Sequence, residues 1–464
     1  MHRLIGIILL AAIGTGPLSA QAPSDTLRLT LDAAIQRALD QGQEVRLARA
    51  DILSARGQVR EAAAAAFPQV TGSVVYTRQF ASIFEGAADD TSGIADIFRN
   101  SPFGAENLWT LQLKATQTLW SGGKVGAGMR AARAYRRAAD ARGRETEADV
   151  AFRVKQAYLA AATSERLLEA AVANFDLARQ QLRQVQLFFR AGTRAEYDLL
   201  RARVDAANQE PPVVAARNAY DIALIELRRL VNVGAEQPLV LVTPLASPDG
   251  TIPVPVDEDI GVSGRAALAQ ADAQVEVQEQ VVRATKADRW PTLSAGTTLE
   301  EQAFPPRGSP FGANYFRNWN AEVRLSFPIF TGFRTAGAVQ RARAELEQVR
   351  AQREQVQEEV ALDAARARAE LARTLALLSA RRETVRQAER AHYLAGVRYT
   401  NGLTTQLEVS DARVLRQQAE VNEIQAMRDY LLALAQLERA LGRAVPVERR
   451  PLDGAVPTTV SEGN

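Results

Sequence analysis

The sequence predicts a mostly α-helical protein that also carries a small set of membrane-type β-strands and is built from two similar halves. Long stretches without proline carry heptad-spaced apolar residues, as in packed helices. Short stretches alternate apolar and polar residues, and all four tryptophans lie in or beside them. Matching segments then recur 210 positions apart along the chain. The fold class and the internal duplication follow from these three observations.

The clearest strand signal is the segment NWNAEVRLSFPIFTG at residues 318–332. Apolar side chains stand at every second position, and polar or charged ones lie between them. A strand points successive side chains to opposite faces, so this segment has one apolar face and one polar, charged face.

Composition excludes several classes of function. A net charge of +2 on 464 residues provides no electrostatic footprint for nucleic acid. The absence of cysteine rules out disulfides, thiolate metal sites and a cysteine nucleophile. A histidine triad or metal site would depend on His392 alone, because His2 lies in the N-terminal leader. We therefore expect no catalytic residues, no metal site and no cofactor, with a carboxylate-only hydrolase as the remaining enzymatic alternative.

Residues 1–20 have the pattern of a signal peptide. Arg3 supplies the positive start, an apolar stretch follows, and Leu18-Ser19-Ala20 provides a small-residue cleavage site. The alternative is a retained N-terminal anchor. No other stretch approaches the ~20 apolar residues that a spanning helix needs. The mature chain is thus expected to be exported and either soluble, surface-attached or held by a β-barrel.

The two halves align at a constant offset over much of their length. Trp109 matches Trp319, and Gly192 matches Gly402, at the offset of 210. Upstream, Phe67-Pro68 matches Trp290-Pro291 at an offset of 223, so the first copy carries 13 extra residues between its strands. Insertions of this kind occur in exposed loops.

Each half has the same order of elements. The first repeat, 21–232, is predicted to hold helices at about 30–41 and 44–66, strands at about 69–80 and 107–121, and a helical hairpin at about 124–232. A proline-rich linker with short extended pieces such as LVLV follows at 233–256. The second repeat, 257–443, is predicted to hold a helix pair near 257–289, strands at about 292–302 and 318–331, and a hairpin at about 334–441. The polar tail, 444–464, is expected to be flexible.

The hairpins begin with very long helices. Without a break, residues 124–191 would form a helix about 100 Å long. Its seven-residue spacing pairs a line of mostly large apolar residues with a line of mostly small ones, which permits close coiled-coil packing; the two lines are Val154, Ala161, Leu168, Phe175, Leu182 and Phe189, and Ala157, Ser164, Ala171, Ala178 and Val185. The second half repeats the pattern at Leu371, Leu378 and Val385, and His392 extends that line as a packing residue. Pro211-Pro212 are expected to break or kink the first returning helix.

Tryptophan placement points the strands to a membrane. Tryptophan prefers the membrane–water interface, so we predict an aromatic girdle of Trp109, Trp120, Trp290 and Trp319. Alternating strands of ~10 residues that end in aromatics are typical of an outer-membrane barrel with a polar lumen. The alternative is a small soluble sheet packed on the helices. Four strands cannot close a barrel, and an open edge cannot face lipid, so several chains would have to share one barrel.

Four segments together resemble the TolC family of outer-membrane efflux channels, over essentially the whole mature chain. Leu29–Val70 is similar to the family's opening helices, and Thr118–Gly123 (TLWSGG) and Phe327–Gly332 (FPIFTG) are similar to its strand-to-helix elements. Arg398–Val414 resembles its helix–turn–helix tip. The resemblance implies a homotrimer in the outer membrane of a diderm bacterium, with a twelve-stranded barrel, four strands from each chain, continued by a coiled-coil helical tunnel through the periplasm.

The function that the resemblance implies is a passive exit duct of a tripartite efflux or type I secretion system. Its partners would be outer-membrane lipid, a periplasmic adaptor and an inner-membrane pump of the RND, ABC or MFS type. Drugs, metals and secreted proteins all remain open as cargo. The competing interpretation is a soluble periplasmic coiled-coil or adaptor protein, which would need no detergent and no role for the strands.

The resemblance also implies site residues. Glu408 and Asp411 match the acidic ring of the pore constriction, which Asp198 would join, and Tyr399 and Asp198 match partners of the entrance latch. The latch arginine expected two residues past Gly402 is Thr404 here, whereas the first half has Arg194 at that offset. The alternative is that the three carboxylates are solvated charges stabilised near helix N-termini.

Two further groups complete the predicted site. The candidate adaptor contacts are the tips Gly192, Thr193, Gly402 and Leu403, where the glycines also end the helices with positive φ. The candidate lumen residues of the barrel are Lys114, Glu322 and Arg324.

Overall fold

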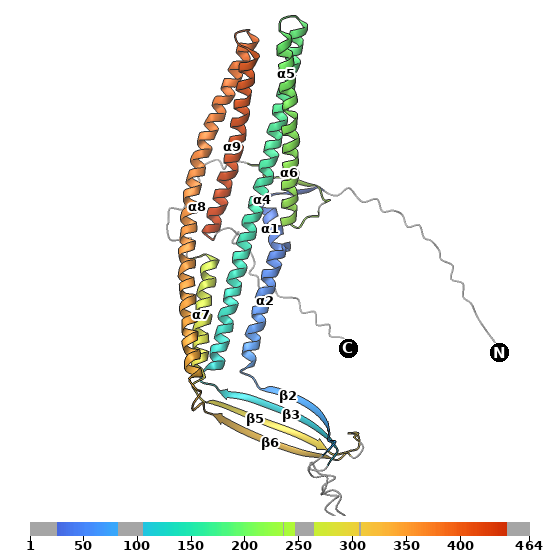
Figure 1. Cartoon of the computed structure of the whole chain (residues 1–464), viewed down its shortest axis with the longest axis vertical. Coiled ribbons are helices and arrows are strands. Elements are labelled where there is room, and N and C mark those ends of the chain that lie inside the picture. Colours follow the sequence, from blue (N-terminus) through green and yellow to red (C-terminus); the bar gives the residue numbers. More distant parts are fainter. Residues whose placement is uncertain (1–25, 82–104, 235, 246–263, 306–307, 443–464) are drawn as a thin grey trace, which may run out of the picture. The chain divides into compact units, whose positions relative to one another are not determined.

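The computed structural model describes residues 26–81, 105–234, 236–245, 264–305 and 308–442 (Figure 1). The predicted signal peptide, most of the loop between the first two strands, much of the linker and the tail lie outside these ranges. So does the first helix of the pair expected near 257–289.

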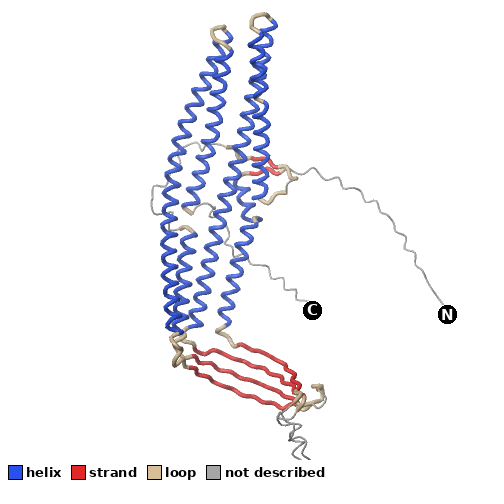
Figure 2. The backbone as a smooth tube through the Cα atoms, viewed as in Figure 1, coloured by secondary structure: helices blue, strands red, loops and turns tan. Residues whose placement is uncertain are grey.

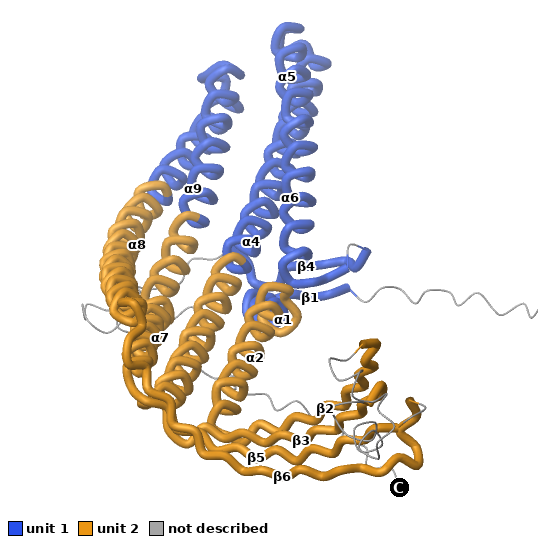
Figure 3. Tube along the Cα trace, turned by 60° about the horizontal axis from the view of Figure 1, so that its bottom comes forward, with its two compact units in different colours: residues 1–38, 154–247, 382–428 blue, residues 39–153, 248–381, 429–464 orange. Residues whose placement is uncertain are grey.

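The chain divides into two compact units, which Figure 3 distinguishes by colour. The first, called here the hairpin unit, comprises residues 1–38, 154–247 and 382–428. The second, the sheet unit, comprises residues 39–153, 248–381 and 429–464.

The sheet unit contains four antiparallel strands in the order β2-β3-β5-β6 (Figure 2). Their bounds are Gln69–Arg78 for β2, Asn107–Trp120 for β3, Thr292–Ala303 for β5 and Tyr315–Ser326 for β6. The two halves of the duplicated sequence contribute one hairpin-like strand pair each, and β3 and β5 join the two pairs. A mostly helical chain with a small set of strands, as the sequence predicted, is thus confirmed.

The fourth strand differs from its predicted span of 318–331. It begins three residues earlier, at Tyr315, and ends at Ser326. Pro328 explains the early end, because proline has no N–H to donate to a strand ladder. The alternating apolar residues Phe327 and Ile329 therefore lie beyond the strand.

The register of the sheet separates polar from apolar side chains. Lys114 lies opposite Thr298, which in turn lies opposite Asn320. The next row of the other face places Leu113 opposite Leu299, and Leu299 opposite Trp319. Directly opposed residues share a face, and neighbours along a strand alternate faces. One face is therefore mainly polar and the other mainly apolar.

Helices of the sheet unit pack through small and branched side chains. The helices α2 (Gln43–Ala64) and α7 (Ala266–Ala287) both lie in this unit. Val282 of α7 forms a buried cluster with Ala342 and Leu346 of α8 (Arg334–Thr400). Arg265, at the N-cap of α7, is buried and pairs with Glu145 at 3.2 Å and Asp363 at 3.3 Å.

The hairpin unit contains parts of two helical hairpins, one from each repeat. The first hairpin is α4 (Lys124–Arg190) followed by α5 (Glu196–Asn208) and α6 (Glu210–Leu230). The second hairpin is α8 followed by α9 (Gln406–Ala440). The first returning helix is interrupted at Gln209, and Pro211-Pro212 occupy the first turn of α6. Proline is tolerated there because the first N–H groups of a helix have no partner within it.

A short parallel sheet pairs the start of the described chain with a segment of the linker. The sequence did not predict these two strands as a pair. The strand β1 (Leu27–Leu29) pairs with β4 (Leu239–Leu241), within the LVLV segment of the linker. The buried hydroxyl of Tyr158 lies 3.1 Å from the carbonyl of Leu29 and accepts from the amide of Thr243 at 2.9 Å. The helix α1 (Leu31–Gln41) follows β1.

Burial follows the heptad seam more closely in the second long helix than in the first. Leu371, Leu378 and Val385 are all buried. In α4, Val154 and Val185 are fully buried, whereas Phe189, the last of the large residues on the predicted line, is exposed. A straight helix drifts relative to a seven-residue repeat, so a single line leaves the buried side over several heptads.

Candidate functional site: the hairpin tips and the polar sheet face

The two tips of the hairpin unit have the same backbone. Thr193 donates its amide to Phe188 at 3.0 Å, and Gly192 donates to Phe189 at 2.9 Å. In the second tip, Leu403 donates to Arg398 at 2.8 Å and Gly402 to Tyr399 at 3.0 Å. These bonds form the Schellman motif, which needs a left-handed residue after the helix. Gly192 and Gly402 fill that position with φ of 71° and 73°.

Arg194 links the first tip to the second hairpin. Its guanidinium carbon lies 4.5 Å from the centre of the Tyr399 ring, within the range of a cation–π interaction. One of its terminal nitrogens also donates to the backbone carbonyl of Tyr399, at 3.4 Å. The structure thus brings the first-half arginine, Arg194, into contact with Tyr399, the tyrosine predicted for the latch.

Tyr399 is held in an apolar cluster. Its side chain packs with Ala395 and Val409, and Phe188 of the first hairpin lies against this cluster. Burial raises the pKa of the Tyr399 phenol; the charge of Arg194 lowers it and that of Asp198 raises it. The charges of the other two predicted latch residues thus act on the Tyr399 pKa in opposite directions.

Glu408, a predicted member of the acidic ring, is paired within its own hairpin. Arg398 donates to its carboxylate at 3.0 Å. The hydroxyl of Thr404 also hydrogen-bonds to Glu408. Thr404, which stands where the family pattern has an arginine, thus binds an acidic residue of α9 rather than a group of the other hairpin.

Asp411 has a different environment. Its side chain is exposed and makes no hydrogen bond or ion pair with any residue in the described part of the chain. Asp198 lies in the first turn of α5, where the helix dipole favours a carboxylate. Of the three predicted ring carboxylates, Glu408 is the one that a cation partly neutralises.

The tips themselves are open to solvent. Leu403 is 70% exposed, and Thr193 is also exposed, although its hydroxyl lies 2.9 Å from the Phe188 carbonyl. Apolar side chains nearby are exposed as well, among them Tyr197 and Leu407. Exposed apolar patches are typical of surfaces that other proteins contact.

The three predicted lumen residues share one face of the sheet. Lys114 lies opposite Thr298, Glu322 opposite Gly296, and Arg324 opposite Ser294. Glu322 and Arg324 also form an ion pair at 3.1 Å along the strand. All three side chains therefore belong to the polar face.

Aromatic side chains gather at both ends of the sheet. At the helix end, Trp120 and Trp290 meet edge to face with ring centres 6.4 Å apart. At the other end, Tyr76 and Trp109 lie 4.9 Å apart. Trp319 departs from the predicted girdle: it is the fifth residue of β6, inside the apolar face, because the strand begins at Tyr315.

Gly122 permits the close approach at the helix end. A Cβ atom at this position would lie 2.7 Å from the Cβ of Trp290, which is too close for any other residue. The glycine of the TLWSGG element therefore has a packing role beside the tryptophan pair.

Sequence reasoning missed the partners of the acidic residues. Arg398 precedes Glu408 by ten residues across the turn, and no pattern of i,i+4 pairing identifies it. Ser410 donates to Asp205 at 2.7 Å. This contact joins the two returning helices, and no sequence pattern predicted it either.

The described helices carry charged residues along their length. No helix within the described ranges is both long enough and apolar enough to cross a membrane. The same ranges hold no group of three or more His, Cys, Asp or Glu side chains that could bind a metal ion.

Comparisons with known proteins agree with this arrangement. The family model "Outer membrane efflux protein" matches residues 34–233 and 262–443. Among curated proteins, no sequence matches the chain.

Several solved structures have the same fold. The channel CusC has a TM-score of 0.74 at 17% identity, with 90% of this chain and 92% of that one covered. VceC from Vibrio cholerae has a TM-score of 0.71 at 21% identity, with 89% and 96% covered. The open state of the Neisseria gonorrhoeae MtrE outer membrane channel has a TM-score of 0.74 at 19% identity, with 89% and 88% covered.

A sheet with one polar and one apolar face, joined to two long helical hairpins, defines an outer-membrane channel of the TolC-like class. The chain belongs to the outer membrane efflux protein family. It is therefore an outer-membrane efflux channel protein.

Proposed function

We propose that three copies of this chain form the exit duct of a tripartite efflux or type I secretion system. The observation that carries the proposal is the open, two-faced sheet. Within the described residues, β2 and β6 each pair on one side only. Unpaired strand edges cannot face lipid, and single-chain barrels begin at eight strands, so several copies must complete the ring.

Three copies would give twelve strands, the number that the resemblance to the TolC family implies. The edge strand β6 of one copy would then pair with β2 of the next. The polar face with Lys114, Glu322 and Arg324 would line the lumen, and the apolar face would meet outer-membrane lipid.

The soluble alternative explains less of the molecule. A periplasmic coiled-coil or adaptor protein needs only the hairpins. The family match, however, includes the segments of all four sheet strands as well as the hairpins. On the proposed function the chain is a passive duct and not an enzyme.

The hairpin tips would form the periplasmic entrance. Tyr399, Arg194 and Asp198 would make the latch, and Asp411 and Glu408 would contribute carboxylates to a constriction. Summed negative potential in a narrow pore favours cations. Since Arg398 partly neutralises Glu408, Asp411 would contribute the larger share of that potential.

The exposed tips at Thr193 and Leu403 would contact a periplasmic adaptor, which in turn connects to an inner-membrane pump of the RND, ABC or MFS type. Photo-crosslinkers placed at these two positions in cells test this contact. Adducts with an exported, membrane-anchored protein support it. Adducts formed equally well from Glu354, far along α8 from the tip, would argue against a specific contact.

The constriction is tested by permeability. The purified channel is inserted in a planar bilayer, and the reversal potential is measured under a KCl gradient. The double variant Glu408→Ala with Asp411→Ala should lose cation preference, and Asp411→Asn alone should lose most of it. Glu354→Gln makes a comparable change of charge elsewhere and should leave the ratio as in the wild type. An unchanged ratio in the double variant would rule out the acidic ring.

A further inference from the structure

A cavity of about 650 Å³ that is open to solvent lies between helices of the two hairpins in the hairpin unit. Its wall combines amide side chains of α4 with basic side chains of α8 and α9: Gln180, Gln181, Gln184, His392, Arg413 and Arg416. All of these residues belong to the same compact unit. The cavity is thus a polar space that touches both hairpins.

Arg413 is the central feature of this wall. The residue is only 2% exposed. Its Nε and one terminal nitrogen, Nη1, have no hydrogen-bond partner among the described residues. A buried guanidinium normally has its N–H groups paired, because an uncompensated buried charge is costly. Two N–H-bearing nitrogens of the Arg413 guanidinium are therefore left without a hydrogen-bond acceptor among the described residues.

Other polar groups on the same wall are unpaired as well. Nδ1 of His392 and the hydroxyl of Tyr399 are both buried and have no partner in the described part of the chain. Both residues line the cavity. Each of these groups can donate a hydrogen bond, as the guanidinium does. Together they favour an occupant that accepts hydrogen bonds.

The neighbouring carboxylates leave the positive charge only partly balanced. Asp205 attracts Arg413 electrostatically, but the hydrogen bond that the Asp205 carboxylate accepts comes from Ser410. Arg416 donates to Asn174 at 3.2 Å and lies 3.5 Å from Glu420. The one carboxylate that lines the cavity itself is Glu389, which is exposed. The cavity wall thus presents two guanidinium groups and one acidic group.

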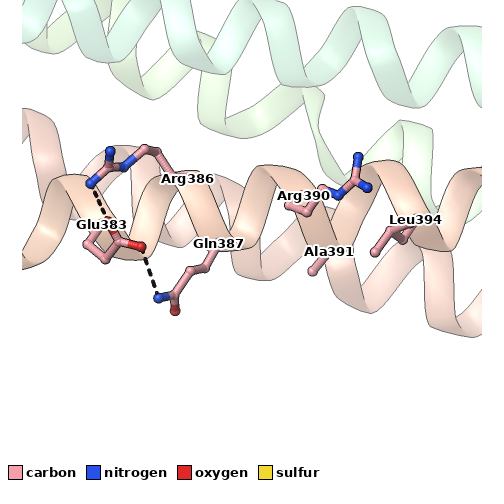
Figure 4. A pocket seen from close by; sticks show the side chains of 6 residues that line it. All are labelled: Glu383, Arg386, Gln387, Arg390, Ala391 and Leu394. Atoms are coloured by element: carbon pink, nitrogen blue, oxygen red, sulfur yellow. Dashed lines mark hydrogen bonds and ion pairs between the residues drawn. The ribbon is translucent and has the colours of Figure 1, made fainter.

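A second hollow, of about 390 Å³, shows the opposite situation (Figure 4). It lies along α8, and its one carboxylate, Glu383, pairs with a neighbouring arginine. Glu383 binds both Arg386 and Gln387, as the dashed lines show, while Arg390 lies over the ring of Tyr393 at 5.4 Å. This surface offers a comparison for the cavity, because Arg386 and Arg390 are exposed and each has a partner.

We propose that the cavity binds a small oxyanion, such as sulfate, phosphate or the carboxylate of a small solute. Arg413 of α9 supplies the charge, and the amides of α4 supply donors from the other hairpin. A bound anion would thereby connect the first hairpin to the second. The same chemistry could come from a free solute or from a carboxylate side chain of a second copy, and the proposal assigns the site to the free solute.

Sulfate binding to the purified full-length protein tests the proposal without reference to conduction. Equilibrium dialysis with radiolabelled sulfate, at constant ionic strength in chloride, should reveal one saturable site per chain. Arg413→Gln should weaken binding at least tenfold. Arg386→Gln, on the surface of Figure 4, should bind as the wild type does.

Gln181→Glu provides a second variant that does not remove a buried group. It places a carboxylate in the cavity, so it should abolish sulfate binding and raise the thermal midpoint in sulfate-free buffer. A wild type without saturable binding, together with a lower midpoint for Gln181→Glu, would assign the cavity to a carboxylate of a second copy and overturn the proposal. Equal sulfate binding in the wild type, Arg413→Gln and Gln181→Glu would also overturn it.

Discussion

At the first hairpin tip the residue two positions beyond the glycine is Arg194, and at the second tip the equivalent residue is Thr404. Both tips close with the same hydrogen bonds and the same left-handed glycine. Arg194 extends to the other hairpin and contacts Tyr399, whereas Thr404 binds Glu408 in its own hairpin. Duplication has thus preserved the backbone while the side chains have taken different partners.

The difference shows that the first tip can supply the arginine for an interaction between the hairpins when the second tip lacks one. The family pattern places the latch arginine in the second tip. Here the first tip supplies an arginine, which makes its contact within one chain. On the proposed function, the latch therefore depends on Arg194 and Tyr399 rather than on residue 404.

Removal of the Tyr399 ring should have the largest effect. Tyr399→Ala deletes a buried aromatic side chain at the junction of the hairpins, which costs about 3 kcal/mol. Amide hydrogen exchange at both tips should accelerate by roughly 100-fold. Tyr393→Ala, an exposed tyrosine on the same helix, is the control and should leave exchange unchanged. Equal acceleration in both variants would show that Tyr399 has no special role.

Loss of the Arg194 contact should have a smaller effect in the same direction. Arg194→Met keeps much of the side chain's length but removes the cation–π interaction, worth about 1 kcal/mol. Exchange at the tips should rise about fivefold, and basal conductance in a planar bilayer should rise with it. Arg203→Met, at an exposed position of α5, should change neither. A Thr404→Ala variant that opened the tips more than Arg194→Met would contradict the assignment of the latch to Arg194.

Arg398 forms an ion pair with Glu408, one of the two predicted ring carboxylates of the second tip, and not with the other, Asp411. Arg398→Gln frees Glu408 from its ion pair and should increase the cation preference of the channel. The free energy of unfolding should change by less than about 1 kcal/mol, because the pair is solvent-exposed. Arg386→Gln removes the same charge from another exposed ion pair on α8 and should not change the reversal potential. A reversal potential that is the same for both variants would show that Glu408 does not face the pore.

His392 should give the smallest effect, visible as a dependence on pH. Burial lowers the pKa of His392, and the charges of Arg416 and Arg413 lower it further. The unfolded chain then binds a proton more readily than the folded chain, so stability is complete above the usual histidine pKa of about 6.5 and declines as pH falls below it. His392→Gln should remove this part of the decline between pH 7 and 5 in thermal unfolding. An identical pH profile in the variant would exclude the histidine as its source.

The sequence predicted the positions of the four sheet strands from local signals. Alternation and tryptophan placement identified the four segments because both reflect side-chain direction within a single element. Pro328 shortened the last strand, and this too has a local cause. The pairing of β1 with β4 was missed because each strand has three residues, too few for any periodicity.

The contacts of the tips could not be predicted in the same way. The positions of Gly192 and Gly402 predicted the turns, since a left-handed residue is a local requirement. The partner of Arg194 is 205 residues away and depends on how two hairpins pack. Likewise, the pairing of Glu408 with Arg398 crosses a turn whose geometry fixes which side chains meet. The resemblance named the candidate residues, but tertiary packing decides their partners.

Assembly of the sheet is the most direct test of the central claim. The full-length protein can be purified from membranes, reconstituted in lipid nanodiscs and imaged as single particles. The account predicts a three-fold particle in which β6 of each copy pairs with β2 of the next and the polar face lines a lumen. A monomer that needs no detergent, with β2 and β6 still unpaired, would contradict it.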